Sequence, residues 1–169
     1  MKFVIYYGST RKQNLKKIMD VLLTELNSRG HTYVVVDDSV APCSNCGFCI
    51  CNDHCCIKDS FPNKELKDCE GIIILSPIFF FSFSAKAKAF LDRLFSVNLE
   101  GKILTSITTS GSETEDMFCG FDIVDEIVYR TSEYCGCKYV KPINFVTEDK
   151  ELKHIDESMI KSFVDSLEV

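Results

Sequence analysis

The side chains with the clearest capacity for chemistry lie in a cysteine-rich loop at residues 40–59. Four thiols follow one another within 13 residues of the chain: Cys43, Cys46, Cys49 and Cys55. Steps with two intervening residues let successive sulfur atoms point at one centre, which is how iron–sulfur clusters and structural zinc ions are bound. The spacing alone leaves three alternatives open: an iron–sulfur cluster, a zinc ion and no metal.

The remaining cysteines and the start of the chain indicate a reducing compartment. The sequence contains ten cysteines, and its N-terminus enters an apolar run without the layout of a secretory signal. We therefore expect a cytoplasmic protein, in which metal or redox chemistry is favoured over a disulfide scaffold. Cys51 and Cys56 are additional thiols of the loop. Four cysteines outside it are expected to be small buried hydrophobic side chains: Cys69, Cys119, Cys135 and Cys137.

A polar turn at residues 8–14 has the composition of a phosphate site. It brings hydroxyls, an amide, a guanidinium and backbone N–H groups to the start of a predicted helix, where anions bind favourably. Lys12, Lys16 and Lys17 crowd this helix start, although the macrodipole disfavours cations there by a few tenths of a kcal/mol each. A bound dianion would reverse that penalty, and a solvated polar helix start is the alternative. With one glycine, the turn is neither a Walker loop nor a GxGxxG turn.

Two further segments contain residues suited to a flat ligand. Residues 76–84 include four phenylalanines in five positions, which favours an aromatic cofactor or a subunit interface over core filling alone. Residues 108–116 begin with small hydroxyl side chains and backbone donors that suit the edge of a heterocycle.

The elements that position these segments alternate between strands and helices. Short apolar strands are expected at 2–7, 33–36, 72–75, 103–108 and 139–146. Apolar residues at three- and four-residue steps predict helices at 15–26, 85–95, 121–128 and 152–167, with a further short helical segment around Leu66. This alternation predicts one α/β domain over residues 1–169, a doubly wound five-stranded parallel sheet of order 2-1-3-4-5 with helices on both faces.

The predicted topology brings the three segments together. Ligands of such sheets bind beyond the carboxyl ends of the strands, where the strand order reverses. The site is therefore expected from the loops after strands 1, 3 and 4, which are residues 8–14, 76–84 and 108–116. The cysteine loop joins strands 2 and 3, and we expect it at the same sheet edge as residues 8–14.

Charge and hydropathy argue against binding to nucleic acid and to membranes. The chain has 19 basic and 25 acidic residues, a formal net charge of −6, which argues against non-specific binding to nucleic acid or to an anionic membrane surface and leaves a local basic patch as the alternative. The most apolar stretch, Gly71–Phe83, is shorter than the roughly 20 residues that a bilayer span needs.

Five motifs together resemble a known family. They are Gly8-Ser9-Thr10-Arg11-Lys12, Cys43-Ser44-Asn45-Cys46-Gly47-Phe48-Cys49, Cys55-Cys56-Ile57-Lys58-Asp59, Ser76-Pro77-Ile78-Phe79-Phe80 and Lys88-Ala89-Phe90-Leu91-Asp92-Arg93. In this order they resemble the flavodoxin-like NAD(P)H-dependent FMN reductases, and most of all the iron–sulfur flavoprotein branch. The likeness covers residues 1–111.

The resemblance implies a flavodoxin-like fold that binds FMN. The phosphate would lie at Ser9, Arg11 and Asn14, the isoalloxazine ring against Pro77 to Ser82, and its polar edge toward Ser110 and Gly111. The full implied set of cofactor-binding residues is Ser9, Thr10, Arg11, Lys12, Asn14, Leu15, Pro77, Ile78, Phe79, Phe80, Phe81, Ser82, Ser110 and Gly111. The resemblance also implies a [4Fe–4S] cluster near the flavin, with Cys43, Cys46, Cys49 and Cys55 as its ligands and Cys56 as a substitute for Cys55.

The sequence departs from the family pattern at four points. The phosphate turn is one residue shorter, and Leu15 replaces a common hydroxyl residue. Phe79 stands where the family often has Tyr, and Phe81 where it often has Gly. A bulky Phe81 either closes over the ring or narrows its site.

The expected function is that of an FMN-dependent oxidoreductase or electron-transfer flavoprotein. NAD(P)H would be the electron donor, the acceptor is unknown, and the chain is expected to form a homodimer or homotetramer. We name no catalytic side chain, because His31, His54 and His154 lie outside the three loops. Response-regulator receivers and low-molecular-weight phosphatases are excluded, because the turn at residues 8–14 has neither acidic residues nor a cysteine. A non-enzymatic zinc-binding interaction module remains the alternative.

Overall fold

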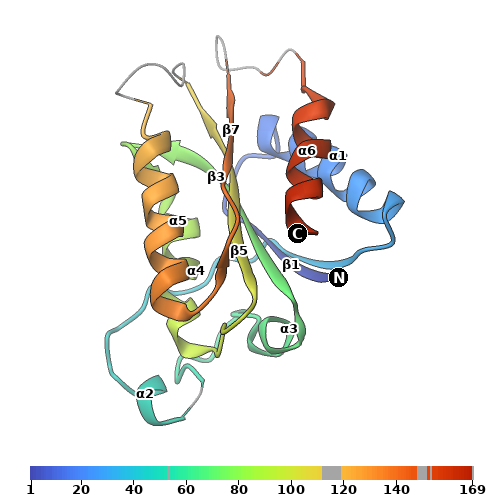
Figure 1. Cartoon of the computed structure of the whole chain (residues 1–169). Coiled ribbons are helices and arrows are strands. Elements are labelled where there is room, and N and C mark those ends of the chain that lie inside the picture. Colours follow the sequence, from blue (N-terminus) through green and yellow to red (C-terminus); the bar gives the residue numbers. More distant parts are fainter. Residues whose placement is uncertain (53, 112–118, 148–151, 153, 169) are drawn as a thin grey trace.

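A twisted parallel sheet forms the centre of the computed structural model, which describes residues 1–169 except 53, 112–118, 148–151, 153 and 169. The strands follow the order β2-β1-β3-β5-β6, with β4 added beside β3 and β7 beside β5 (Figure 1). Because β6 and β7 together occupy the fifth position, the predicted order 2-1-3-4-5 is confirmed.

The strands agree with the predicted apolar runs, with three differences. Their bounds are β1 Lys2–Tyr7, β2 Thr32–Val36, β3 Gly71–Phe79, β4 Ser82–Phe83, β5 Ile103–Ser110, β6 Lys138–Tyr139 and β7 Ile143–Val146. First, β3 and β5 extend further than expected, into the two segments predicted as loops. Second, β4 turns back antiparallel against the end of β3. Third, the predicted fifth strand is divided in two.

The division of the fifth strand has a local cause. Ile103 pairs with Lys138, but Ile107 pairs with Ile143, so the strand holds one residue more than its neighbour over this interval. Such an insertion is a β-bulge. Pro142 lies within it and has no N–H with which to continue the ladder.

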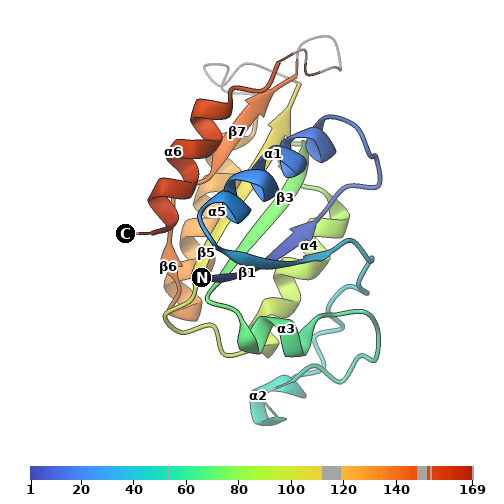
Figure 2. The same cartoon turned by 90° about the vertical axis from the view of Figure 1, so that its right-hand side faces the viewer.

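Helices cover both faces of the sheet, as predicted. They are α1 Asn14–Ser28, α2 Cys49–Asn52, α3 Asn63–Asp68, α4 Ala85–Arg93, α5 Phe121–Cys135 and α6 Glu157–Leu167, with a 3-10 turn at Leu94–Ser96. Helices α1 and α6 lie on one face, and α4 and α5 on the other (Figures 1 and 2). Helix α6 begins at residue 157 rather than 152, because the Asp156 carboxylate accepts the Ser158 N–H at 2.9 Å and caps it. None of the described helices has both the length and the apolar character needed to cross a bilayer.

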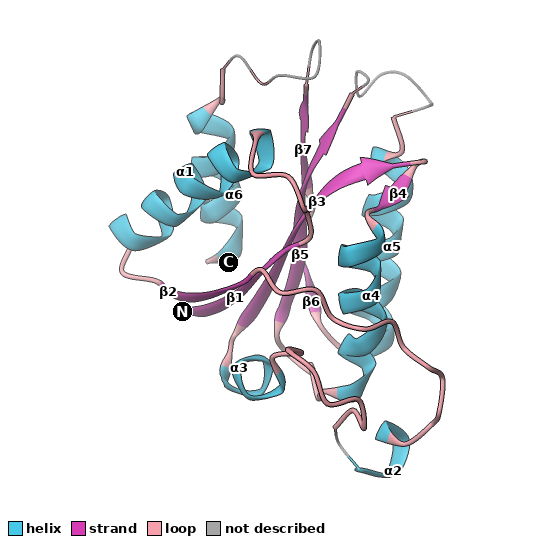
Figure 3. Ribbon diagram, turned by 180° about the vertical axis from the view of Figure 1, so that it is seen from behind, coloured by secondary structure: helices cyan, strands magenta, loops and turns pink. Residues whose placement is uncertain are grey.

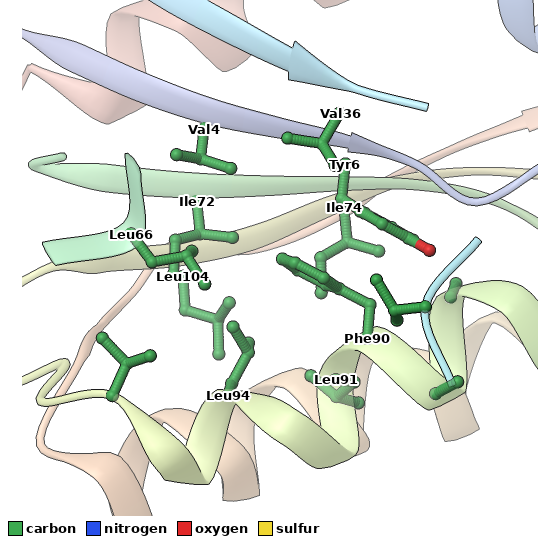
Figure 4. Close-up of a cluster of buried hydrophobic side chains, with 14 of the residues drawn as sticks. Val4, Tyr6, Val36, Leu66, Ile72, Ile74, Phe90, Leu91, Leu94 and Leu104 are labelled. Atoms are coloured by element: carbon green, nitrogen blue, oxygen red, sulfur yellow. The ribbon is translucent and has the colours of Figure 1, made fainter. Parts of the chain in front are cut away.

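Each face of the sheet has its own hydrophobic core. Figure 4 shows the core between the sheet and α4, where Val4, Ile72 and Leu104 meet Leu94. Here the Tyr6 ring stacks on the ring of Phe90, with centroids 3.9 Å apart. The second core lies between the sheet and helices α1 and α6. Since β1 and β3 are buried on both sides, their sequences are continuously apolar rather than alternating.

Candidate functional site

A pocket of about 170 Å³ lies at the carboxyl ends of β1, β3 and β5. It is lined by Ser9, Arg11, Gln13, Asn14, Leu15, Pro77, Ile78, Phe79, Thr109, Ser110, Gly111 and Thr147. The fold thus brings the three predicted segments to one place. Gln13 and Thr109 belong to the predicted loops but were not named as cofactor-binding residues, and Thr147 lies outside the three predicted loops. Thr147 directly follows β7, whose last residue pairs with Ser110, so only the register between β5 and β7 places it here.

The turn after β1 is fixed by its own hydrogen bonds. The Ser9 hydroxyl oxygen accepts the Arg11 N–H at 3.1 Å, and the Tyr7 hydroxyl donates to the Arg11 carbonyl at 2.7 Å. Burial, together with the nearby charge of Asp37, raises the pKa of Tyr7, so this hydroxyl keeps its proton at neutral pH. The backbone of Arg11 is therefore anchored, while its guanidinium group is exposed beside the pocket.

The start of helix α1 next to this turn is suited to an anion. The residue before the helix, Gln13, makes no side-chain cap, and the first turn contains no acidic residue. The Lys16 and Lys17 N–H groups donate to the Gln13 carbonyl at 3.0 and 3.2 Å, and the helix dipole is positive at this end. The Lys16 ammonium forms an ion pair with Asp20 on the next turn, so it contributes less positive charge to the turn than the sequence suggested.

Gly8 connects this turn to residues 75–84 through two hydrogen bonds. The Gly8 N–H donates to the Leu75 carbonyl at 2.7 Å, and the Ser84 hydroxyl donates to the Gly8 carbonyl. Ser84 also caps α4 by accepting the Ala87 N–H at 3.2 Å. The Ser84 N–H donates to the Ser76 hydroxyl oxygen in β3 at 3.0 Å, so this one serine joins the end of β1, β3 and the start of α4 next to the pocket.

The phenylalanine segment is a β-hairpin rather than an open loop. Phe79 pairs with Ser82, and the two residues between them have φ angles of 47° and 66°. Positive φ at both central positions is the geometry of a type I′ turn. Phe79 lines the pocket, whereas Phe80 is 97% exposed, Phe81 is 42% exposed and Phe83 is buried in the core. The four rings therefore have different environments.

The third side of the pocket joins β5 to β7. The Asn144 amide donates to the Ser110 hydroxyl oxygen at 2.9 Å, and the Thr147 hydroxyl donates to the Ser110 carbonyl at 3.0 Å. Gly111 beside them is exposed. The remainder of the predicted loop, from residue 112 to residue 116, lies outside the described residues.

Several residues implied by the family resemblance do not line the pocket. They are Thr10, Lys12, Phe80, Phe81 and Ser82. Leu15 lines it but is only 4% exposed and packs into the core of α1 and α6, so its backbone N–H is the group it can offer a ligand. The Asn14 side-chain oxygen accepts the Leu152 N–H at 3.0 Å, and this bond ties the pocket to the segment before α6.

The cysteine loop forms a second, smaller pocket of about 80 Å³. Its lining includes all four predicted ligands, Cys43, Cys46, Cys49 and Cys55, together with Cys56. Cys51 does not line it. The Cys46 and Cys56 sulfur atoms are 3.3 Å apart, and all ten cysteines are free thiols. Of the cysteines outside the loop, Cys69 and Cys119 are buried as predicted, but Cys135 and Cys137 are only half-buried.

Backbone and side-chain donors favour the thiolate form of one cysteine in this pocket. Hydrogen bonds from the Phe48 backbone, the Cys56 thiol and the Ser44 hydroxyl lower the pKa of Cys46. Thiolates are the form that binds metals. In the described part of the chain, no three His, Cys, Asp or Glu side chains are grouped around a point where a single metal ion would bind.

Within one chain, the predicted placement of the cysteine loop at the same sheet edge as residues 8–14 is wrong. Helix α2 in the cysteine loop lies beyond the amino ends of the strands, whereas β4 and the end of β7 mark the opposite end, where the first pocket lies (Figures 1 and 3). From the end of β2, the chain runs back along α4 before it reaches the cysteines. The two pockets are therefore separated by the length of the sheet within one chain.

Comparisons with known proteins agree with this architecture. A sequence profile of the NADPH-dependent FMN reductase family matches residues 1–119. An iron–sulfur flavoprotein of Methanosarcina thermophila is 31% identical over 123 residues, which are 66% of this chain and 64% of that protein. An iron–sulfur flavoprotein of Archaeoglobus fulgidus is 30% identical over 100 residues, 56% of this chain and 46% of that protein. The matched region thus spans between about half and two thirds of these curated relatives.

Solved structures show the same fold. A flavodoxin from the domain Archaea superposes with a TM-score of 0.63 at 19% identity and covers 99% of this chain and 97% of its own. Oxidised flavodoxin 2 of Bacillus cereus superposes with a TM-score of 0.68 at 19% identity, covering 99% and 98%. At these identities the likeness concerns the fold, which is flavodoxin-like. With the profile match over residues 1–119, it follows that the chain belongs to the NADPH-dependent FMN reductase family.

Proposed function

We propose that this protein is an FMN-binding oxidoreductase that accepts electrons from a reduced nicotinamide cofactor and passes them to an unidentified acceptor. The observation that carries the proposal is the pocket at the carboxyl ends of β1, β3 and β5. Its two ends differ in the way that FMN requires: a cationic helix start on one side and apolar residues with small hydroxyls on the other.

The residues around the pocket fit the parts of FMN. Arg11, the Ser9 hydroxyl and the first N–H groups of α1 would bind the phosphate dianion. Pro77, Ile78 and Phe79 would pack against the isoalloxazine ring, with Ser110 and Gly111 near its polar edge. When bound, FMN supplies the hydride and single-electron chemistry, while the protein supplies binding, orientation and electrostatics.

A pair of ligands tests the phosphate end of this pocket. We expect saturable binding of FMN, measured by quenching of flavin fluorescence, and weaker binding of riboflavin, which has no phosphate. Charge-assisted hydrogen bonds contribute about 1.5–3 kcal/mol each, so Arg11→Ala should weaken FMN binding roughly 10- to 150-fold and leave riboflavin binding nearly unchanged.

The control for Arg11→Ala is a variant that removes an arginine charge far from the pocket, on helix α5. Arg130 is exposed on α5 and pairs with Glu126, so Arg130→Ala should bind FMN as the wild type does. Absence of saturable FMN binding, or an equal loss in both variants, would contradict the proposal.

We further propose that the cysteine loop binds a [4Fe–4S] cluster that relays single electrons. The cluster's thiolates bind different iron atoms, so the sulfur atoms need not converge on one point, as they must around a zinc ion. Two observations support this assignment: five cysteines line the pocket, and the pKa of Cys46 is lowered. The alternative, a non-enzymatic zinc module, lacks a preformed group of three ligands among the described residues.

Two cysteines of the same loop provide a matched test. After anaerobic reconstitution with iron and sulfide, Cys46→Ser should lose most of its bound iron, because this thiol lines the pocket. Cys51→Ser should retain wild-type iron and sulfide, because Cys51 lies outside it. Zinc without sulfide in the wild type would favour the zinc module, and equal iron in both variants would contradict the assignment of ligands.

We also propose that the protein works as a homodimer or homotetramer. Within one chain, the first pocket lies at the carboxyl ends of β1, β3 and β5, whereas helix α2 of the cysteine loop lies beyond the amino ends of the strands, so a direct relay between the two sites would be long. Contact between copies would let the cysteine loop of one chain approach the flavin pocket of another.

A further inference from the structure

A buried arginine lies directly under the cysteine loop. Arg93 is the last residue of α4, and its side chain is 0% exposed. Its guanidinium donates to the Asp59 carboxylate at 2.5 Å, to the Ala41 carbonyl at 3.3 Å and to the Ile57 carbonyl at 3.4 Å. The guanidinium also lies over the Phe61 ring, 4.4 Å from its centroid. A charge this deeply buried is retained only where partners compensate it.

These contacts close the cysteine loop at its base. Asp59 accepts the Ala41 N–H at 2.8 Å as well as the Arg93 guanidinium. Ala41 comes before Cys43, and Ile57 comes after Cys56, so all six loop cysteines lie between the two ends that Arg93 holds. These hydrogen bonds between protein groups join the two ends to α4 and to each other.

The same side chain contacts a residue that lines the cysteine pocket: Ile57, whose carbonyl accepts its hydrogen bond at 3.4 Å. Burial alone would lower the pKa of Arg93, but hydrogen bonding with Asp59, the charge of Asp59 and the interaction with Cys55 together raise it. One buried donor, Arg93 Nε, has no acceptor in the part of the chain that the structure describes. Cluster sulfur atoms accept hydrogen bonds, and such bonds help to set the reduction potential.

We propose that Arg93 is a positioning residue for the metal site: it holds the cysteine loop closed before metal binds, and it places a positive charge behind the cysteine pocket, next to its lining residue Ile57. The inference rests on the proposed cluster for its second half only. Residues that support metal ligands from behind typically change metal affinity 10- to 100-fold when they are replaced. Reduction adds a negative charge to a cluster, so a neighbouring cation stabilises the reduced form.

The first experiment uses metal-free protein and trypsin. Lys58 is an exposed cleavage site inside the loop, so the rate of cleavage there reports loop opening. We expect Arg93→Met to raise this rate at least tenfold, and Arg130→Met, on the outer surface of α5, to leave it unchanged. Far-UV circular dichroism and the midpoint of urea unfolding verify that each variant is folded.

The second experiment separates the charge from the packing. In the reconstituted protein, Arg93→Met should bind iron about 10- to 100-fold more weakly and shift the cluster potential to more negative values. Asp59→Asn removes the opposite charge with little change in shape and should shift the potential to more positive values. Arg93→Lys keeps the charge and should hold the potential near the wild type while the loop opens faster, because lysine cannot reach all three acceptors.

The outcomes separate this inference from the proposed function. If folded Arg93→Met protects Lys58 as the wild type does, or if Arg93→Met and Asp59→Asn shift the potential in the same direction, the inference is overturned. If the wild type takes up no iron, the proposed cluster fails, and the trypsin experiment still decides whether Arg93 closes the loop.

Discussion

Phe80 and Phe81 both adopt the left-handed backbone region, which side chains with a Cβ atom enter at a cost of about 1–2 kcal/mol per residue. Type I′ turns normally place Asn and Gly at these positions. The Phe81 backbone is also tightly enclosed, because a Cβ atom on Gly120 would lie 2.4 Å from the Phe81 Cα. Strain of this kind persists where the surrounding structure over-determines it, and it is often found at binding sites.

Replacing Phe81 with glycine should therefore stabilise the protein. We expect Phe81→Gly to raise the free energy of unfolding by about 1 kcal/mol, since glycine adopts this conformation without strain. Phe81→Ala is the control, because it removes the ring but keeps the Cβ atom and the strain. Urea unfolding followed by circular dichroism compares the two, and a Phe81→Gly protein no more stable than Phe81→Ala would argue against the strain.

At the scale of elements, β1, β3 and α4 approach one another closely next to the pocket proposed for FMN. A Cβ atom on Gly8 would lie 2.6 Å from the Ala87 Cβ and 2.8 Å from the Leu75 carbonyl oxygen. Both distances are below van der Waals contact. The phosphate turn begins at Gly8, so its position depends on this close approach of α4.

A double-mutant cycle tests the junction. Gly8→Ala should destabilise the protein by about 1–3 kcal/mol through overpacking and weaken FMN binding by displacing the turn. Ala87→Gly alone should cost about 1 kcal/mol in helix propensity. If α4 is the obstacle, the double variant will be less destabilised than the two single effects added together. Strict additivity in unfolding measurements would show that the two residues do not interact.

The order of the elements could be predicted from the sequence because the central strands are buried on both faces and therefore consist of continuous apolar residues. Continuous apolar runs such as that of β3 indicate a parallel sheet, and right-handed crossovers leave few arrangements. The hairpin after β3 was missed because Phe80-Phe81 lacks the glycine or asparagine that marks a type I′ turn. The bulge before β7 depends on register, which local sequence does not specify.

The candidate sites were predictable to different degrees. The carboxyl ends of β1, β3 and β5 necessarily meet at one edge, so the pocket followed from topology. Thr147 was missed because its place depends on the register of β7. The cysteine loop was placed at the wrong end because the 34 residues between β2 and β3 can reach either end, and the sequence does not show that Arg93 holds the loop at the far end of α4.

At the scale of the whole molecule, exposed apolar side chains gather at both ends. Phe79, Phe80 and Phe81 are exposed in the hairpin after β3, next to the pocket proposed for FMN. Phe95 and Tyr134, with ring centroids 6.0 Å apart, are exposed on the side of the cysteine loop. Exposed aromatic groups of this size are typical of interaction surfaces. Covering both ends by other copies of the chain would bury them and bring the two kinds of site together.

Self-association through these ends should be visible in the mass of the protein in solution. We expect light scattering at micromolar concentration to give a multiple of the 19.2 kDa chain mass. Phe80→Ser should shift the mass toward that of one chain, because Phe80 is almost fully exposed in the single chain and loses only contacts between copies. Lys161→Ser introduces the same residue at an exposed position of α6 and should leave the mass unchanged. A wild-type mass of 19.2 kDa would contradict self-association, and the exposed phenylalanines would then contact the flavin or another protein. If Phe80→Ser does not change the mass of an oligomeric protein, the contact between copies does not involve Phe80.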